Sequence, residues 1–187
     1  MITFITTAYN EKKEANVFLN SLLLQDNPNW KCVVYADVPN EYIKNLILDI
    51  NDNRIIYYQN DLKTGFWGHK NRQFALQNLV DTDFVLQSSI QDYYLPITVS
   101  SILQHSKTHD FIYFDCIHNG FGYNVLSTSP KVCHIDWGCF AVRTDIAKKI
   151  DITNTESRVT DGIFVENCMK LSSIKVLKIN KILLIHN

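Results

Sequence analysis

The sequence predicts a single α/β domain with a mainly parallel, mixed β-sheet flanked by helices on both faces. Short apolar runs alternate with segments whose apolar residues recur at helical spacing, which is the rhythm of βαβ units. The run 84–86 (Phe-Val-Leu) lies between acidic and polar residues, as is typical of a strand buried on both faces. A chain of 187 residues with 46% hydrophobic residues is large enough for one packed core.

The first half of the chain predicts strands and helices in strict alternation. Expected strands are 2–6, 31–36, 54–58 and 84–86, and expected helices cover about 17–23, 42–50 and 69–76.

In the second half, we expect Pro96 to open a helix that runs to His105, because proline suits the first helical position. Thr144 is expected to cap a short helix that runs to Ile150, and 118–130 predicts a loop or hairpin. Further expected strands are 110–116, 140–142, 175–179 and 182–185, with a helix at 163–171.

Composition and charge exclude several classes of protein. The formal net charge of -1 provides no field for holding nucleic acid or an anionic membrane. No apolar run approaches the roughly 20 residues of a transmembrane helix, and residues 1–5 lack the features of a signal peptide. The five cysteines are scattered, odd in number and without a CxxC pair, which predicts reduced thiols. We therefore expect a cytoplasmic chain without a leader.

Asp92 follows the predicted central strand through the polar turn 88–92. Because ligands of open α/β sheets bind beyond the carboxyl ends of strands, Asp92 is a candidate for handling a metal or a phosphate. The alternative is that Asp92 only caps the helix expected near Pro96.

Several different short motifs are distributed along the whole chain. They are 5–11 (ITTAYNE), 22–30 ending in Trp30, 68–76 with Arg72, 83–96, Asp161-Gly162 and 184–187 (LIHN). In this order and spacing the chain resembles a family 2 glycosyltransferase of the GT-A fold, as a minimal nucleotide-diphospho-sugar transferase domain. The resemblance implies one domain, 1–187, with a nucleotide-binding half at 1–92 and an acceptor and catalytic half at 93–187.

The resemblance also implies a divalent cation, Mn²⁺ or Mg²⁺, that neutralises the leaving diphosphate. Asp92 and His186 would be its ligands. His186 could instead be a frayed terminal residue, but its position directly after the predicted strand 182–185 favours the ligand. The family usually shows two acids (DXD) where this chain has Ile90-Gln91-Asp92, so the first acid is missing. Gln91 can form hydrogen bonds there but cannot replace a charge.

For the nucleotide, the resemblance places Thr7, Tyr9 and Glu11 along one side of the groove and Asp37 at the base or ribose. Tyr9 could instead be a core aromatic residue. The planar, permanently charged guanidinium of Arg72 suits a phosphate, while a plain surface position is the alternative.

For catalysis, the resemblance makes Asp161 the general base that removes the proton of the acceptor hydroxyl, and Asp136 the second candidate. Asp161 could instead be a simple helix cap. Trp137 is suited to stacking on an acceptor sugar beside Gly138, and the segment 118–129 is expected to shape the acceptor site.

The sequence thus predicts an inverting, metal-assisted glycosyltransferase that moves a sugar from a nucleotide donor, with a UDP-sugar favoured, to a glycan, lipid-linked or protein hydroxyl. One alternative is a catalytically inert sugar-nucleotide or glycan-binding module. A nucleotidyltransferase is disfavoured because residues 6–10 are neither glycine-rich nor basic. A homodimer is compatible with the sequence.

Overall fold

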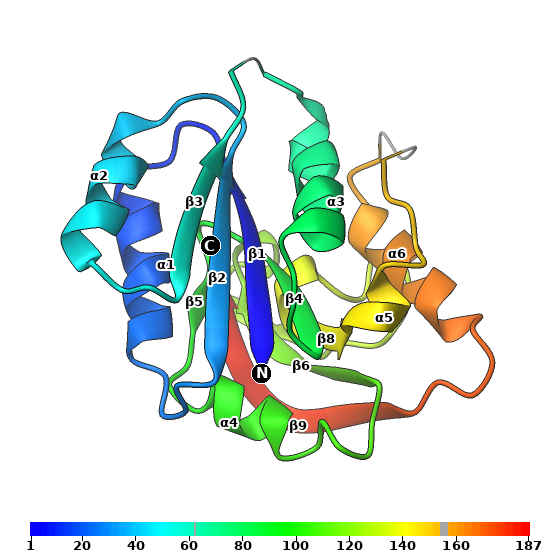
Figure 1. Cartoon of the computed structure of the whole chain (residues 1–187). Helices are drawn as coiled ribbons and strands as arrows, with labels where there is room; N and C mark the ends of the chain where they lie inside the picture. Colours follow the sequence, from blue (N-terminus) through cyan, green and yellow to red (C-terminus); the bar gives the residue numbers. More distant parts are fainter. Residues whose placement is uncertain (62, 154–156) are drawn as a thin grey trace.

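The computed structural model of the chain describes residues 1–61, 63–153 and 157–187. Its centre is a curled, nine-stranded mixed sheet with helices on both faces (Figure 1). The strand order is β3-β2-β1-β4-β8-β6-β9-β5, and β7 pairs with β6 off this path. The predicted α/β class is confirmed.

The N-terminal half is a parallel sheet. Its strands are β1 (Ile2–Ala8), β2 (Trp30–Ala36), β3 (Ile55–Gln59) and β4 (Phe84–Ser89), and β1 lies between β2 and β4. The helices α1 (Lys13–Leu23) and α2 (Glu41–Ile50) lie on one face, and α3 (His69–Asn78), which follows the short helix η1 (Phe66–Gly68), lies on the other (Figure 1). All four strands therefore end at the same edge of the sheet.

The C-terminal half adds antiparallel pairs. β8 (Phe140–Arg143) is antiparallel to both β4 and β6 (Phe111–His118), whereas β9 (Val176–His186) is parallel to β6 and pairs with β5 (Tyr93–Tyr94). The remaining elements are α4 (Thr98–Leu103), η2 (Asn119–Phe121), β7 (Asn124–Leu126), η3 (Trp137–Cys139), α5 (Thr144–Ala147) and α6 (Thr160–Met169).

Three local expectations differ from the structure. The helix after Pro96 begins only at Thr98, because the Pro96 carbonyl accepts a hydrogen bond from the Asp26 backbone instead (2.8 Å). Thr144 is the first residue of α5 and its side chain caps nothing. The two predicted strands at 175–179 and 182–185 form one strand, β9, whose register against β6 shifts at an irregularity beside Asp115.

Stacked aromatic rings connect the core to the region beyond the strand ends. Phe111 stacks on Phe140 at 5.1 Å between centroids, and Phe140 stacks on Phe164 of α6 at 5.9 Å. Phe164 in turn contacts Trp137 at 5.3 Å. Because aromatic pairs of this kind contribute roughly 0.5–1.5 kcal/mol beyond burial, they fix η3 and α6 relative to the sheet.

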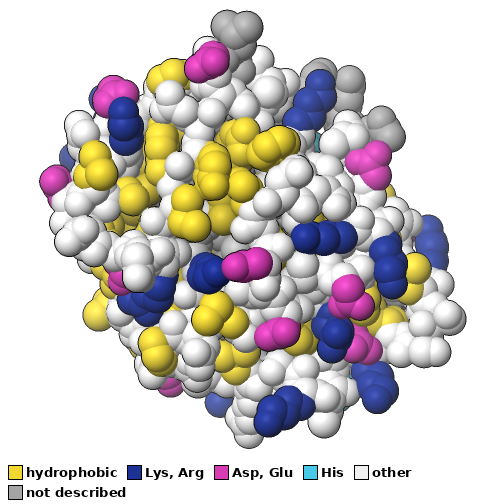
Figure 2. All heavy atoms as spheres, in the orientation of Figure 1, with side chains coloured by type: hydrophobic (Ala, Val, Ile, Leu, Met, Phe, Trp, Pro, Cys, Tyr) yellow, Lys and Arg dark blue, Asp and Glu magenta, His cyan; other side chains and the backbone are white. Residues whose placement is uncertain are grey.

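The surface is polar over much of one face but carries hydrophobic side chains over β2 and β3, between α2 and α3 (Figure 2). The exposed side chains of Ile56, Tyr58 and Phe74 belong to these elements. Among the helices of residues 1–61, 63–153 and 157–187, none combines the length and apolarity needed to cross a membrane. All five cysteines are free thiols, and only Cys133 is exposed.

Candidate active site

A cavity of about 730 Å³ lies beyond the carboxyl ends of β1 and β4, where ligands of α/β sheets bind. It brings together residues that are up to about 180 positions apart in sequence. Ten of the predicted site residues line it: Thr7, Tyr9, Glu11, Asp37, Arg72, Gln91, Asp136, Trp137, Asp161 and His186. The other two, Asp92 and Gly138, do not.

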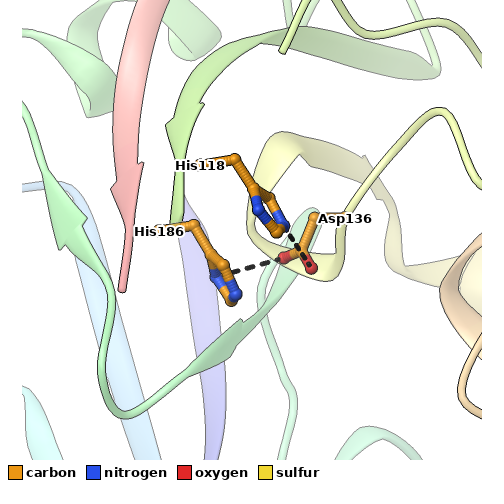
Figure 3. Close-up of side chains that lie close together, drawn as sticks. All are labelled: His118, Asp136 and His186. Carbon is orange, nitrogen blue, oxygen red and sulfur yellow. Dashed lines mark ion pairs between the residues drawn. The ribbon is translucent and has the colours of Figure 1, made fainter. Parts of the chain in front are cut away.

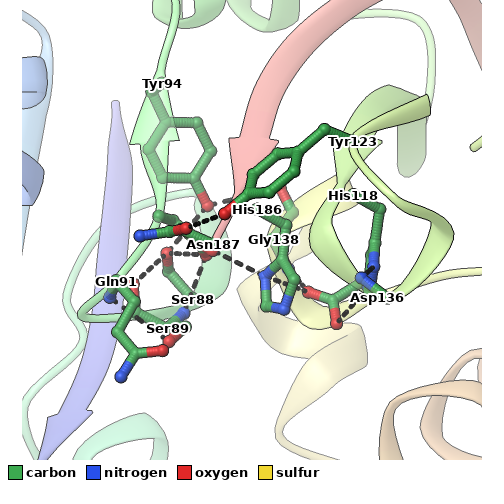
Figure 4. Close-up of polar contacts among 12 residues, drawn as sticks. Ser88, Ser89, Gln91, Tyr94, His118, Tyr123, Asp136, Gly138, His186 and Asn187 are labelled. Carbon is green, nitrogen blue, oxygen red and sulfur yellow. Dashed lines mark hydrogen bonds and ion pairs between the residues drawn. The ribbon is translucent and has the colours of Figure 1, made fainter. Parts of the chain in front are cut away.

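The turn after β4 presents neutral side chains to the cavity. Ser89 and Gln91 line it, whereas Ile90 and Asp92 are buried. The carboxylate of Asp92 accepts hydrogen bonds from the Ser88 hydroxyl (2.7 Å) and the Ser89 backbone (2.8 Å). Figure 4 shows Ser88, Ser89 and His186 among the residues of this group of polar contacts. The acid therefore points into the protein, which differs from the expectation that Asp92 touches the ligand directly.

Asp92 reaches the cavity only through His186. The imidazole Nδ1 of His186 lies 2.8 Å from Oδ1 of Asp92. A carboxylate only accepts hydrogen bonds, so Nδ1 carries the proton of this contact and Nε2 is left for other partners. Burial alone would lower the pKa of His186, but the hydrogen bond that its ring donates to Asp92 and the negative charges of Asp136 and Asp92 raise it to about 9.

Asp136 and His118 complete a cluster with His186 (Figure 3). One ligand-type atom from each of the three side chains lies within 4.8 Å of the others. Asp136 precedes η3, and its Oδ1 accepts a hydrogen bond from the Gly138 backbone at 3.0 Å. His118 ends β6 and its ring packs against that of His186 at 4.3 Å between centroids. Burial, followed by the proximity of His186, lowers the pKa of His118 and keeps it neutral.

Arg72 is a buried cation that forms no ion pair within the part of the chain that the structure describes. Only 5% of its surface is exposed, and its Nε and Nη1 have no hydrogen-bond partner among the described residues. Desolvation lowers its pKa to about 10, against the opposing effect of Asp136, Asp92 and Asp161, so that it stays charged at neutral pH. Its guanidinium lies 5.8 Å from the ring centre of Trp137.

Glycine allows the start of α3 to approach the sheet. Gly68 has a φ of +72°, and a Cβ at this position would lie 2.7 Å from Oγ1 of Thr7. The glycine thus places His69 and Arg72, on the first turn of α3, against the carboxyl end of β1. This is the physical reason for a glycine in that motif.

Asp37 lines the cavity and accepts hydrogen bonds from the residues around it. Its Oδ1 accepts hydrogen bonds from the Thr64 backbone (3.0 Å) and from the Asn71 amide (3.1 Å). Among the described residues, the contact of its Oδ2 is the longer one with the Gly65 backbone, at 3.4 Å. Oδ2 is therefore the atom of this carboxylate with capacity left for a ligand.

Asp161 lies in the first turn of α6 rather than before the helix. Burial, and next the charge of Asp136, raise its pKa to about 7, against the hydrogen bond that its Oδ1 accepts from the Gly162 backbone. A carboxyl group that titrates near neutral pH can accept a proton during a reaction and release it afterwards.

Gly138 is buried, contrary to its expected contact with an acceptor. A Cβ there would lie 2.6 Å from Cδ2 of Leu184 and 2.8 Å from Oδ2 of Asp92. The residue is a glycine because η3 packs directly on Asp92 in the turn after β4 and on Leu184 of β9, the strand that carries His186. Trp137, next to it, does line the cavity.

Sequence reasoning missed several residues at or beside the cavity. Lys63 lies over the ring of Tyr9 at 4.0 Å, and Arg158 over that of Trp67 at 5.2 Å. His69 and Ser89 line the cavity, and His118 lies behind it against His186. His69 and Ser89 lie within the motifs 68–76 and 83–96, which were a signal for them. His118 begins the segment 118–129 that was expected to shape the acceptor site, but nothing local in the sequence marks this residue or Arg158 individually.

Comparison with known proteins gives a limited match in sequence. No protein-family model matches the chain. Over 136 residues the chain is 25% identical to WcaA of Escherichia coli strain K12, which is named as a colanic acid biosynthesis glycosyl transferase. The match covers 70% of this chain and 48% of WcaA, so the chain spans about half the length of that relative.

Solved structures match the chain over its whole length. The crystal structure of S. aureus TarS 1–349 has a TM-score of 0.79 and 23% identity, and the match covers 100% of this chain and 60% of TarS 1–349. The same protein in complex with UDP-GlcNAc has a TM-score of 0.77 and 24% identity, with 98% of this chain and 57% of the other covered.

Proposed function

We propose that this chain, which has the GT-A fold of the glycosyltransferases that it matches, transfers a sugar from a UDP-sugar to a hydroxyl acceptor with inversion at the anomeric carbon. The predicted GT-A fold is confirmed by the solved structures, and the sequence match to WcaA supports the resemblance to family 2 glycosyltransferases. UDP as the nucleotide is supported by the TarS complex with UDP-GlcNAc.

Arg72 carries this proposal. A buried guanidinium without a partner costs several kcal/mol, and an anionic ligand would compensate for that cost. Its planar fork suits the oxygens of a diphosphate. A cavity of about 730 Å³ is also within the usual size range of small-molecule sites.

We assign the nucleotide to the half formed by residues 1–92. Thr7, Tyr9 and Glu11 line the cavity there, and Oδ2 of Asp37 has capacity to accept a hydrogen bond from an N–H of the base or a ribose hydroxyl. The sugar and the acceptor would lie toward residues 93–187, where Trp137 offers an aromatic face.

Asp161 is the proposed general base. In an inverting transfer the acceptor oxygen attacks the anomeric carbon, the bond from that carbon to the phosphate oxygen breaks, and UDP leaves. The proton of the acceptor hydroxyl passes to the carboxylate of Asp161, whose pKa of about 7 suits this step at neutral pH. Asp136 remains the second candidate base.

His186, with Asp92 bonded to its Nδ1, also fits a role as ligand of a divalent cation. Because Nδ1 of His186 faces Asp92, a cation would bind Nε2 in place of the second proton that the raised pKa of this ring keeps there at neutral pH. Mn²⁺ or Mg²⁺ bound there would neutralise negative charge on the diphosphate as a Lewis acid. Asp92 would act behind His186, and Arg72 would contribute a fixed positive charge in the same cavity.

The second candidate function is a sugar-nucleotide or glycan-binding module without turnover. The neutral side chains of Ser89 and Gln91 at the end of β4 favour it, since they cannot supply the charge of a DXD motif. It predicts UDP binding that is unaffected by Asp161→Asn and no release of UDP from any UDP-sugar.

Thermal unfolding with UDP and with GDP, each with Mn²⁺ and with a chelator, tests the donor site. A ligand at about one hundred times its Kd adds roughly 2.7 kcal/mol. For a domain of this size we expect the midpoint to rise by about 5 to 10 °C. A rise with UDP supports the proposal, and no rise with any nucleotide overturns it.

Turnover is then measured as UDP release from a panel of UDP-sugars in the presence of simple glycoside acceptors. Release that Asp161→Asn abolishes supports the transferase. Binding of UDP without release, together with unchanged binding in Asp161→Asn, would instead establish the binding module.

A further inference from the structure

We infer that α3 sets the position of Asp161 relative to Arg72, and that His69 is the positioning residue that connects the two. The inference rests on the proposed function, in which Arg72 binds the diphosphate and Asp161 removes the proton of the acceptor. His69 acts on this reaction through the backbone that precedes α6.

One side of α3 holds the connection between α5 and α6. His69, Gln73 and Gln77 are spaced four residues apart, so their side chains lie on the same side of the helix. Each forms a hydrogen bond with the backbone of that connection: His69 with Ser157 (3.4 Å), Gln73 with Ile152 (3.3 Å) and Gln77 with Lys148 (2.9 Å). Residues 148, 152 and 157 therefore follow α3 from its C-terminal to its N-terminal end, and α6 begins beside α3 (Figure 1).

His69 is the contact of this set that lies at the cavity. It is the first residue of α3, only 4% of its surface is exposed, and it lines the cavity together with Arg72, three residues further along the helix. The carbonyl of Ser157 that it contacts also accepts a hydrogen bond from the hydroxyl of Thr160, the first residue of α6, at 2.6 Å. One carbonyl thus joins the start of α3 to the turn of α6 that carries Asp161.

The imidazole of His69 is in the form that this contact requires. A carbonyl oxygen only accepts hydrogen bonds, so Nε2 of His69 carries the proton. Burial, and next the charge of Arg72, lower the pKa of His69 against the effect of the Ser157 contact, so the ring is neutral at neutral pH. Its one N–H group is therefore directed to the backbone that precedes α6.

A second contact joins the same two segments. The guanidinium of Arg158 lies 5.2 Å from the ring centre of Trp67, two residues before His69. Both of these side chains are exposed, where a cation–π contact is weak. The buried imidazole of His69 is therefore the stronger of the two links.

The rest of α6 is held independently of α3. A Cβ at Gly162 would lie 2.4 Å from Cα of Val132, and Phe164 stacks on Phe140. Both of these contacts follow Asp161 in the chain, whereas His69 holds the residues before it. Loss of the His69 contact is therefore expected to shift Asp161 without unfolding the helix, and a displacement of about 1 Å at an active site can cost roughly 100-fold in rate.

Kinetics of His69→Phe test the positioning role, because phenylalanine keeps a ring of similar size and removes the N–H group. We expect kcat to fall at least about ten-fold, while KM for the UDP-sugar and Kd of UDP change less than about two-fold because Arg72 is retained. In His69→Gln an amide N–H can reach the same carbonyl, so most of kcat should return. Gln77→Leu is the matched control: it removes the same kind of bond to the same connection, outside the cavity, and should keep kcat.

A titration of the Asp161 carboxyl group by carbon NMR tests the inference without turnover, and Asp161→Asn identifies its signal. Burial is the largest cause of the raised pKa of Asp161, which is about 7. An acid that moves toward water in His69→Phe should therefore titrate closer to 3.8. The charges of Asp136 and Arg72, which raise and lower this pKa, are the same in the wild type and the variant.

Thr160→Val is a second variant that keeps the shape of the side chain. It removes the other hydrogen bond to the Ser157 carbonyl and should lower the midpoint of Asp161 as well. Thermal unfolding checks that each variant is folded. An unchanged midpoint in both variants, or an equal loss of kcat in Gln77→Leu, would overturn the inference. A wild type without turnover, in which His69→Phe still lowers the midpoint, would refute the transferase and support the positioning of Asp161 by α3.

Discussion

Nδ1 of His186 lies 2.8 Å from Oδ1 of Asp92, so a side chain of the last strand is bonded to a fully buried carboxylate in the turn after β4. The contact joins two segments that are 94 residues apart. Because the acid is buried and the imidazole reaches the cavity, the acid acts on any ligand through the imidazole.

Asp92→Ala is expected to destabilise the protein strongly. It leaves the Ser88 hydroxyl, the Ser89 backbone N–H and His186 without their acceptor. Removing one partner of a buried ion pair typically costs roughly 3–5 kcal/mol, which urea unfolding measures. Asp92→Asn keeps an acceptor oxygen and should cost less. Equal stability of wild type and Asp92→Ala would contradict the described network.

Arg72→Met is expected to weaken UDP binding at least about ten-fold without lowering stability. Replacing a buried charge by an apolar side chain of similar length is often neutral or stabilising, by about 1–4 kcal/mol. Isothermal calorimetry and thermal unfolding measure the two effects separately. Arg54→Met is the matched control: Arg54 is paired with Asp52 at 2.6 Å and lies outside the cavity, so it should lose stability and keep UDP affinity.

Asp161→Asn is expected to lower the rate of transfer about 10²–10⁴-fold, as for loss of a general base. In the wild type, activity should rise with pH through about 7, as the carboxyl group loses its proton. Asp136→Asn is expected to lower this midpoint, because the charge of Asp136 helps to raise the pKa of Asp161. A profile that is flat between pH 5 and 9 would exclude Asp161 as the base.

Asp161→Asn is also expected to change the stability of the protein in a way that depends on pH. The folded state holds the proton of Asp161 more tightly than the unfolded state, so its contribution to stability is present at low pH and is lost as pH rises from 3.8 through about 7. We expect Asp161→Asn to gain stability relative to wild type over this range, by at most about 4 kcal/mol. Urea unfolding at pH 5 and pH 8 measures the difference.

Gly162→Ala is expected to destabilise the protein more than Gly138→Ala. A Cβ at Gly162 would lie 2.4 Å from Cα of Val132, which is backbone, whereas the closest atom to a Cβ at Gly138 is the side-chain Cδ2 of Leu184, at 2.6 Å. A side chain can move where a backbone cannot. Overpacking of this kind typically costs about 1–3 kcal/mol, and the reverse order in urea unfolding would contradict these contacts.

The sequence alone determined the α/β class and the order of most elements, because strand and helix periodicity are local. Ten of the residues that line the cavity were also named from the sequence, most of them because the resemblance to family 2 glycosyltransferases implied them. Several of these residues, such as Thr7, Asp37 and Gln91, follow the ends of parallel strands, which meet at one edge of the sheet.

Only the tertiary structure decided which way the side chains of the turn after β4 point, and which residues from distant segments contact them. That Asp92 turns inward follows from hydrogen bonds with Ser88 and Ser89 and from the arrival of His186 on β9, and none of these shows in the turn's own residues. His118 came to the site because β6 and β9 pair in parallel, with His118 opposite His186. Pairing between distant strands places side chains that no local pattern marks, and for that reason only the folded chain shows that Asp92, His118 and His186 lie together.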